Sequence, residues 1–539
     1  MKKINLTYNF LTNKFTLKYT LNSPLGKVGM GLFIFVSVFY ACNKTIEEPI
    51  KDAYIVADLD VKSGTWKTFV LATPTDVTIV DAKDITSAEY KAEVDKLKTT
   101  IGAVTTEQQT AVAYWGAGSV YRWNEIAREL CAKYNIPPTA NADGKYPVPN
   151  ADSSKVNPNY YPKFPFANPP YAARALAYLS VAQYDALVAA THYGQKYNRK
   201  AVSKNDASVR ALLPVSDATT YPSQEATVAG ASSVILKAMF PLEVTYIDQK
   251  VAECENARYW AGMNVESEVV SGDALGKAVG AKIMARAKTD GMGAANNQTM
   301  TATMIENAKK LGVTETWVSQ ENPARPPMLP TYGNVATWNM VKADLETVRP
   351  AMPPVVGSAA FTTALNELVD ISKKQTREQA RIANYWSDGA GSYTPPGHWH
   401  RIAANLCFDN RYSEVRTART LALMGTAMQD AGISCWETKY YYYIPRPQQV
   451  DSRIKTTVGV PNFPSYTSGH STFSAAAAGV LSYIFPSETA NMNEKAIQAS
   501  ESRIYGMIHY RFDCEKGLEA GKKIGNYAVE RGKKDGSGF

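Results

Sequence analysis

The sequence predicts an all-α protein built from two tandem helix bundles, of which only the C-terminal bundle carries an intact site. Alanine-rich stretches and apolar residues spaced at i, i+3 and i+4 recur along the chain, whereas runs of β-branched residues are few. The chain also repeats itself: the segment that starts at Tyr221 aligns without a gap with the one that starts at Tyr466, 245 positions later. Two bundles of this kind, stacked together, give an α-helical protein.

The first 42 residues are typical of an export signal. Five lysines and no acidic residue precede the apolar run from Val28 to Ala41, which is shorter than the roughly 20 residues that span a bilayer. The residues up to Cys42 resemble a loose bacterial lipobox, with Cys42 as the lipidated first mature residue. We therefore expect an exported protein, either periplasmic or anchored to the outer membrane as a lipoprotein. The alternative is a plain signal with a chance cysteine.

The composition is that of an ordinary globular protein, with 45% hydrophobic and 20% charged residues. The net charge of +8 is mild and dispersed, so we expect no nucleic-acid partner, and a membrane contact only through the lipid anchor. The sequence does not set an oligomeric state. After Cys42 the chain has an odd number of cysteines, so at most two disulfides are possible. None has metal-ligand spacing, and we expect them to be small buried hydrophobic residues: Cys131, Cys254, Cys407, Cys435 and Cys514.

The repeat sets the predicted boundaries. Residues 43–100 have no clear pattern, although Thr65 to Leu71 and Val77 to Val80 are candidate short strands. Residues 101–300 form the first bundle, interrupted at 137–170 by an insertion rich in Pro and Tyr that is typical of a structured loop. Residues 301–374 connect the bundles, and 375–539 form the second one. The clearer helices are Arg174 to His192, Thr227 to Met239, Glu266 to Lys288, Arg377 to Tyr385, Val415 to Glu437, Ser471 to Ile484 and Glu494 to Met507.

Three short blocks in the second copy carry candidate chemistry: Lys439-x6-Arg446-Pro447, Ser468-Gly469-His470 and Ser502-Arg503-x5-His509-x3-Asp513. The aligned first copy has Gly194, Glu225, Asn264 and Glu268 in place of Lys439, His470, His509 and Asp513. We therefore interpret the first copy as a scaffold that has lost the chemistry.

Each block supplies groups that bind an oxyanion. Ser468 precedes a strong helix, whose N-terminal N–H groups and dipole attract anions, although Ser468 also suits a plain helix cap. Arginine recognises oxyanions with a planar fork and lysine with a point charge. His509 and Asp513 are four residues apart, so they share a face if both lie on one helix. Arg503 is then about 240° away from His509, so it must reach round, or the helix breaks near Gly506.

The three blocks, in this order, resemble the superfamily of type 2 phosphatidic acid phosphatases, bacterial acid phosphatases and vanadium-dependent haloperoxidases. One departure is Thr467, where that family usually has proline. The resemblance implies that Lys439, Arg446 and Arg503 neutralise the oxyanion while Ser468 and the Gly469 N–H donate to it. It also implies that His509, steadied by Asp513, bonds to vanadium or phosphorus, and that His470 is the acid–base residue.

Three features favour the haloperoxidase branch. Two tandem bundles with one active copy resemble the fungal and algal haloperoxidases. The segment from Trp386 through Asp388-Gly389 to Thr394-Pro-Pro-Gly-His398-Trp399 is similar to a stretch of bacterial haloperoxidase-like proteins. Trp436 and Phe463 match the two aromatic positions of the fungal chloroperoxidase halide pocket, although both residues also suit a core.

We therefore expect vanadate as the cofactor, with hydrogen peroxide, a halide and an organic acceptor as substrates. His470 would take the peroxide proton and Lys439 would polarise the peroxide. Because vanadate and phosphate are nearly isosteric, the alternative is an acid phosphatase that attacks a phosphate ester with His509. A second alternative is a non-catalytic surface lipoprotein. His398 and His400 are candidates for the site entrance or for structural roles, and Asp388 is a candidate partner of a site arginine.

Overall fold

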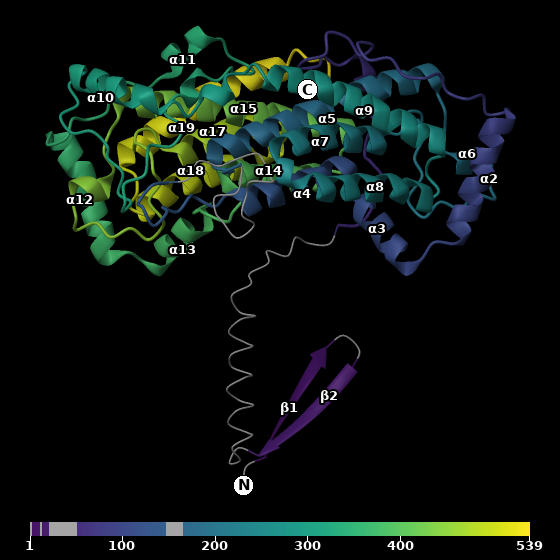
Figure 1. Ribbon diagram of the computed structural model, residues 1–539, viewed down its shortest axis with the longest axis horizontal. Helices are drawn as coiled ribbons and strands as arrows, with labels where there is room; N and C mark the ends of the chain where they lie inside the picture. The colour runs from purple at the N-terminus through teal and green to yellow at the C-terminus, as the bar shows by residue number, and fades with distance from the viewer. Residues whose placement is uncertain (1–2, 11–12, 21–50, 147–164, 539) are drawn as a thin grey trace. The chain divides into compact units, whose positions relative to one another are not determined.

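Long helices lying side by side make up the helical unit Asp52–Phe539 of the computed structural model (Figure 1). The structure describes residues 3–10, 13–20, 51–146 and 165–538. Helices from the first half of the sequence occupy one end of the unit, and those from the second half occupy the other. The described part of this unit is helical and contains no strand, which confirms the all-α fold class.

The helices follow one another along the whole unit. Their bounds are η1 Val61–Thr65, α2 Ala88–Gly102, α3 Thr106–Gly116, α4 Ser119–Tyr134, α5 Pro169–Tyr197, α6 Val202–Asn205, α7 Gln224–Met239, η3 Pro241–Glu243, α8 Val244–Trp260, α9 Glu266–Ala287, η4 Met292–Ala294, η5 Gln298–Met300, α10 Thr301–Lys310, η6 Tyr332–Asn334, α11 Lys342–Val348, α12 Ala359–Lys374, α13 Arg377–Tyr385, α14 Thr394–Asp409, α15 Glu414–Tyr442, α16 Pro447–Val450, α17 Gly469–Ile484, η7 Pro486–Glu488, α18 Thr489–Tyr505 and α19 Arg511–Gly532. All seven helices expected from the sequence are present, and most begin or end a few residues away from the expected positions.

The repeat in sequence is matched by a repeat in helix length. α5 and α15 both have 29 residues, α7 and α17 have 16, α8 and α18 have 17, and α9 and α19 have 22. Each pair starts 245 positions apart. This regularity supports a duplicated origin for the two helix sets.

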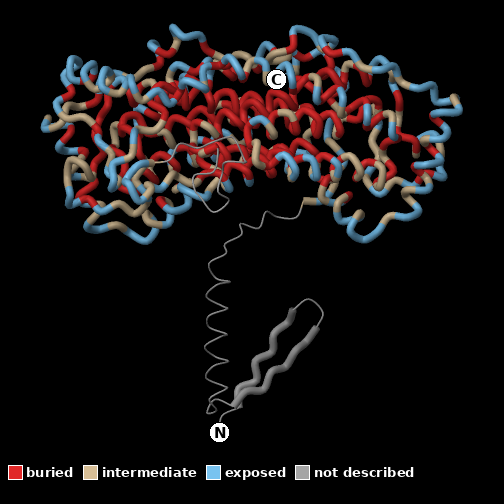
Figure 2. The backbone as a smooth tube through the Cα atoms, in the orientation of Figure 1, coloured by how far each residue is buried: buried red, intermediate tan, exposed pale blue. Residues whose placement is uncertain are grey.

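The two helix sets share one core. α5 packs against α15 along the middle of the unit, while α7 packs on α9 and α17 on α19. The buried backbone forms a continuous band through these helices (Figure 2), and the hydrophobic cluster there draws residues from both copies. Glycines allow the closest approaches: a Cβ on Gly517 of α19 would lie 2.9 Å from the Ser468 carbonyl oxygen, so this glycine sets α19 against the start of α17.

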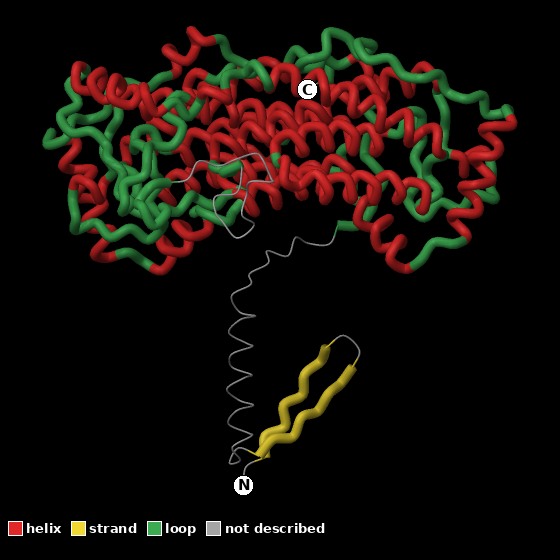
Figure 3. Tube along the Cα trace, in the orientation of Figure 1, coloured by secondary structure: helices red, strands yellow, loops and turns green. Residues whose placement is uncertain are grey.

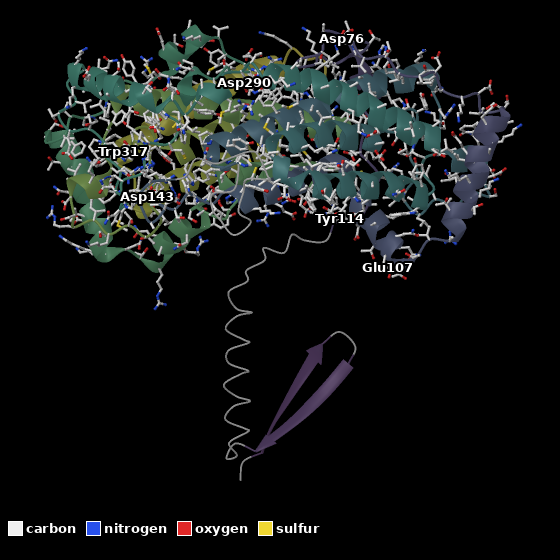
Figure 4. All side chains as sticks on the ribbon, viewed as in Figure 1. Asp76, Glu107, Tyr114, Asp143, Asp290 and Trp317 are labelled. Atoms are coloured by element: carbon white, nitrogen blue, oxygen red, sulfur yellow. The ribbon has the colours of Figure 1, made fainter. Side chains whose placement is uncertain are left out.

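Buried ion pairs recur at the same repeat positions. Arg174 of α5 donates from Nε to Asp290 at 2.7 Å, and Arg419 of α15 donates to Asp535 at 2.6 Å. Figure 4 labels Asp290, whose carboxylate also accepts from the Tyr178 hydroxyl. Because each pair closes the end of its own helix set, these interactions are structural.

The described residues 51–87, directly before α2, contain no strand, so the candidate strands at Thr65 to Leu71 and Val77 to Val80 were wrong. The backbone N–H groups of Phe69, Val70 and Leu71 donate instead to the buried carboxylate of Asp185. Asp430, at the equivalent position of the second copy, accepts from Trp338 and Asn339 in the same way. A carboxylate thus satisfies the donors that a strand ladder would have used.

Outside the helical unit, β1 (Lys3–Phe10) pairs antiparallel with β2 (Asn13–Thr20). The sequence pattern did not predict this hairpin. Cys42 and the apolar run before it lie outside the described residues, so the export and lipidation hypotheses stay predictions. Among the residues that the structure describes, no helix has both the length and the apolar character that a membrane span needs.

The cysteine prediction is confirmed for the described cysteines, all of which are buried and free of disulfides. Residues 147–164, the middle of the predicted insertion, lie outside the described part of the chain. The described ends of the insertion, at Pro137, Phe166 and Pro169, line a cavity of the second helix set.

Candidate active site

The three sequence blocks meet where several elements of the second copy end. Lys439 lies in the last turn of α15, Ser468 caps α17, and Arg503 lies in the last turn of α18. His509 lies in the short link before α19, and Asp513 lies in the first turn of α19. Loops gather at this end of the unit, next to α12 and α13 (Figure 3). We call Lys439, Arg446, Ser468, Gly469, Arg503 and His509 the cradle.

His509 is fixed as a neutral ring with its lone pair on Nε2. Its Nδ1–H donates to Asp513 Oδ2 at 2.8 Å, because an ionised carboxylate only accepts. Nε2 therefore carries the lone pair, which accepts from Arg446 Nη1 at 3.3 Å. Burial, and then the charges of Arg446 and Lys439, holds the pKa of His509 well below its ordinary value. Nε2 is thus available as a ligand or a nucleophile.

The sequence left open whether His509 and Asp513 share one helix, and they do not, because α19 begins at Arg511, after His509. α18 ends at Tyr505, and Met507 in the link has a φ of 58°. The alternative, a helix break near Gly506, is confirmed. Asp513 reaches back because it occupies the third position of α19, where its carboxylate accepts from the backbone N–H of Tyr510.

A serine outside the predicted blocks completes the histidine–carboxylate pair. Ser465 Oγ donates to Asp513 Oδ2 at 2.5 Å and lies 3.3 Å from His509 Nδ1. Burial raises the pKa of Asp513 to about 6, while the Ser465 hydrogen bond and the nearby cations oppose that rise. The aligned first copy keeps a hydroxyl here, in Thr220, which donates to Glu268. A hydroxyl residue at this position in both copies is the sequence feature that could have identified Ser465.

The two arginines are held by hydrogen bonds, chiefly to backbone carbonyls. Arg446 donates to Phe463 O at 3.0 Å and to Ile508 O at 2.8 Å. Arg503 donates to Ser502 Oγ and to Ala383 O. Burial lowers the pKa of each guanidinium to about 10, and both remain charged at neutral pH.

Lys439 does more than carry a charge. Its fully buried ammonium donates to the carbonyls of Pro464, Ser465 and Thr467 at 3.0, 2.7 and 2.5 Å. All three of its protons therefore hold the loop that leads into Ser468. A direct contact between Lys439 and an oxyanion or peroxide stays a prediction.

Replacing Lys439 with methionine should destabilise the fold as well as the site. Three buried carbonyls lose their donor, and one unsatisfied buried acceptor costs about 1–3 kcal/mol. We expect the free energy of unfolding, measured by denaturant titration, to fall by at least that amount. A Lys439→Met protein as stable as the wild type would show that the ammonium does not hold this loop.

The block Ser468-Gly469-His470 forms the start of α17. Ser468 Oγ accepts from the Ser471 N–H at 3.4 Å, so Ser468 does cap the helix. Burial, and then the charge of Arg503, holds the pKa of His470 well below its ordinary value, whereas a hydrogen bond with the Trp386 backbone opposes that shift. His470 Nε2 is buried, has no hydrogen-bond partner among the described residues, and lies 3.9 Å from Asp388 Oδ2.

A cavity of about 550 Å³ opens onto these groups. Gly469, His470, Arg503 and His509 line it, together with Asp388. Its wall includes the aromatic rings of Trp436 and Phe463, whose centroids lie 4.9 Å apart. The Lys439 ammonium lies 5.0 Å from the centre of the Phe463 ring. The two predicted halide-pocket residues are therefore buried beside the cradle and reach the cavity surface.

The residues fit a tetrahedral oxyanion. Three buried cations, Lys439, Arg446 and Arg503, lie near His509, and the charge of each lowers the pKa of His509. Arg503 lines the cavity, whereas Lys439 and Arg446 are not among the described residues that line it. Arg446 Nη2 is buried and has no hydrogen-bond partner among the described residues. The donor set and the unprotonated Nε2 of His509 match what vanadate or phosphate requires.

Anion binding should weaken in alkaline solution. Burial lowers the pKa of Lys439 to about 8, so its positive charge is lost as the pH rises through that value. We expect the affinity for sulfate, whose own charge is constant in this range, to fall at least about tenfold between about pH 7 and pH 9.5. Calorimetric titration measures this affinity. An unchanged affinity over that range would contradict the role of Lys439 as the titrating cation.

The first copy has filled its equivalent site with its own side chains. Glu225, at the position of His470, forms an ion pair of 3.0 Å with Arg258, the counterpart of Arg503. Arg258 also donates to Asn264, which in turn donates to Glu268. The arginine that the first copy retains is therefore neutralised internally, as expected for a scaffold.

Comparison with known proteins found one family model and solved structures of similar fold. The PAP2 superfamily model matches residues 419–526, which hold every cradle residue. The predicted resemblance to this superfamily is thereby confirmed. No curated protein matches the chain. The crystal structure of the first bacterial vanadium-dependent iodoperoxidase is 24% identical, with a TM-score of 0.53, and the alignment covers 67% of this chain and 91% of that one. An apo bacterial vanadium-dependent chloroperoxidase aligns at 13% identity and a TM-score of 0.45, over 68% and 93% of the chains.

The structure also brings in residues that the blocks did not contain. Asp388 faces His470, as well as Arg503, whose pKa its charge raises. His398 lies beside Asp388, whereas His400 is fully buried against Asn124 and does not line the cavity. The sequence suggested Asp388 only through its neighbourhood, because its contact with His470 spans 82 positions.

Proposed function

We propose that the cradle binds vanadate and that the protein is a vanadate-dependent haloperoxidase. The observation that carries this proposal is His509: a neutral imidazole whose Nε2 lone pair faces buried arginines and a cavity. The aromatic pair Trp436 and Phe463 beside the cations offers an apolar place for a large, weakly hydrated halide.

Vanadate, when bound, supplies a Lewis acid that activates hydrogen peroxide. His509 Nε2 would hold it, while Arg446, Arg503 and the Gly469 N–H would bind its oxygens. His470 Nε2, which has a free lone pair at neutral pH, would take a proton from the peroxide and return it to the departing oxygen. Asp513 keeps His509 in the tautomer that this requires.

A phosphomonoesterase is the second candidate, because the same lone pair on His509 is placed to attack phosphorus. In that reaction His470 would protonate the leaving group, and the arginines would neutralise the transferring phosphoryl group. The cradle does not distinguish the two oxyanions, since they are nearly isosteric.

A paired assay on the purified, metal-stripped protein separates these candidates. One half receives vanadate, hydrogen peroxide and bromide or iodide with a dye acceptor, and the other receives a chromogenic phosphate ester. The proposal predicts halide oxidation that depends on added vanadate. Halide oxidation that persists without vanadate, or ester hydrolysis that vanadate inhibits competitively, would contradict it. If the folded protein responds in neither assay, the result favours the second alternative, a protein without catalytic activity.

A further inference from the structure

A second histidine lies behind the acid–base residue, connected to it through one carboxylate. Near the start of α14, His398 Nδ1 lies 3.1 and 3.2 Å from the two carboxylate oxygens of Asp388. Asp388 Oδ2 lies 3.9 Å from His470 Nε2 on its other side. Asp388 is thus placed between two imidazoles.

The position of the His398 ring is fixed by its neighbours. It stacks on Trp386, with ring centroids 4.4 Å apart and planes at 24°. Its Nε2 lies 3.4 Å from the Tyr385 hydroxyl, and its side chain is only 6% exposed. A ring held in this way directs Nδ1 at the carboxylate and at little else.

The loop that carries Asp388 is held in an unusual conformation. Asp388 has a φ of 42°, in the left-handed region that Asp tolerates better than most residues. Asn135, from the first helix set, donates to the carbonyls of Gly389 and Ser392 and accepts from the N–H of Gly391. Residues of both copies therefore keep the carboxylate against the cavity.

We propose that His398 is a positioning residue that aims the Asp388 carboxylate at His470 Nε2 and so stabilises the protonated form of His470. This inference deepens the proposed function, on which it rests, because it adds a residue to the acid–base apparatus. The Nδ1–H of His398 donates to the carboxylate and fixes its orientation. When His470 Nε2 is protonated, the Asp388 carboxylate attracts the positive ring, whereas Arg503 repels it.

The expected titration of His470 depends on the charged and titratable groups around His470, Asp388 and His398. The charges of Arg503 and Lys439 disfavour protonated His470, and a positive charge on His398 would do the same. The Asp388 carboxylate, 3.9 Å from His470 Nε2, is the negative group that favours it. Around His398, the titratable groups are Tyr385 on α13 and Tyr393 before α14, besides Asp388 itself. Removing the Nδ1 donor should release Asp388 from His470, so the His470 titration should move to lower pH.

The matched pair of variants is His398→Phe and His398→Asn. Phenylalanine keeps the stack on Trp386 but has no donor, whereas the asparagine amide nitrogen takes the place of Nδ1. Tyr385→Phe is the control, since it removes the partner of Nε2 and leaves the Asp388 contact intact. We expect turnover to fall about 10–100-fold in His398→Phe, to recover most of this loss in His398→Asn, and to change less than about threefold in Tyr385→Phe.

The test uses two measurements on the full chain. The first is turnover against pH, in whichever activity the wild type shows. The second is the His470 ring titration, followed by NMR of histidine-labelled protein saturated with inorganic phosphate, which needs no turnover; the chain has only five histidines, and His470→Gln assigns the signal. A lower His470 midpoint in His398→Phe that His398→Asn restores supports the proposal, even if the wild type lacks haloperoxidase activity. An unchanged His470 signal in His398→Phe would overturn it, whether or not the proposed function holds.

Discussion

Replacing His509 should remove vanadate-dependent turnover and vanadate binding together. His509 Nε2 is the one neutral nitrogen of the cradle with a lone pair beside both buried arginines. Mutation of a residue that hydrogen-bonds to a metal ligand lowers metal affinity or activity about 10–100-fold. Loss of the ligand itself should have a larger effect, and we expect turnover to fall at least about 10³-fold. Steady-state halide oxidation and a vanadate-binding titration measure the two effects.

The chain itself offers the best replacement. The first copy has Asn264 at this position, and Asn264 donates to Glu268 much as His509 donates to Asp513. His509→Asn should therefore keep the fold and lose the ligand. His192→Ala, on α5 and outside the cavity lining, is the control for loss of a histidine. A His509→Asn protein that binds vanadate with unchanged affinity would place the oxyanion elsewhere.

Replacing His470 should separate catalysis from binding. A positioned acid–base residue contributes about 10²–10⁴-fold to rate, so His470→Ala should lower turnover by that factor. The oxyanion partners, Arg446, Arg503 and His509, remain, so vanadate affinity should change less than about tenfold. The measurement is turnover at saturating vanadate, compared with the vanadate affinity of the same protein.

Two outcomes would contradict this division of roles. If His470→Ala loses affinity and rate in equal measure, His470 binds the oxyanion and does not transfer protons. If it keeps the wild-type rate, another group carries the proton, and Asp388 would be the first to examine because it lies 3.9 Å from His470.

The cradle could be predicted from the sequence because its chemistry lies in three short blocks. Each block is local: a cation in a helix end, a hydroxyl and glycine at a helix start, and a histidine four residues from a carboxylate. The helices could be predicted because their apolar spacing is regular and occurs twice. α5 and α15 have the same length, as the alignment of the two copies suggests.

The parts that could not be predicted depend on contacts between distant residues or on backbone hydrogen bonds. Lys439 donates to three carbonyls of a loop that begins 25 positions later, and no residue type marks a carbonyl as an acceptor. Asp388 meets His470 only because Asn135, far earlier in the chain, ties down its loop. The sequence did not decide whether the helix breaks before His509, because Gly506 permits a break without requiring one.

The most direct test of the central claim is a crystal structure of the protein with vanadate bound. We expect vanadium bonded to His509 Nε2, beside the 550 Å³ cavity that His509 lines, with its oxygens contacting Arg446, Arg503 and the Gly469 N–H. Vanadate bound at another place, with His509 still donating to Asp513 and still accepting from Arg446 at Nε2, would contradict this expectation.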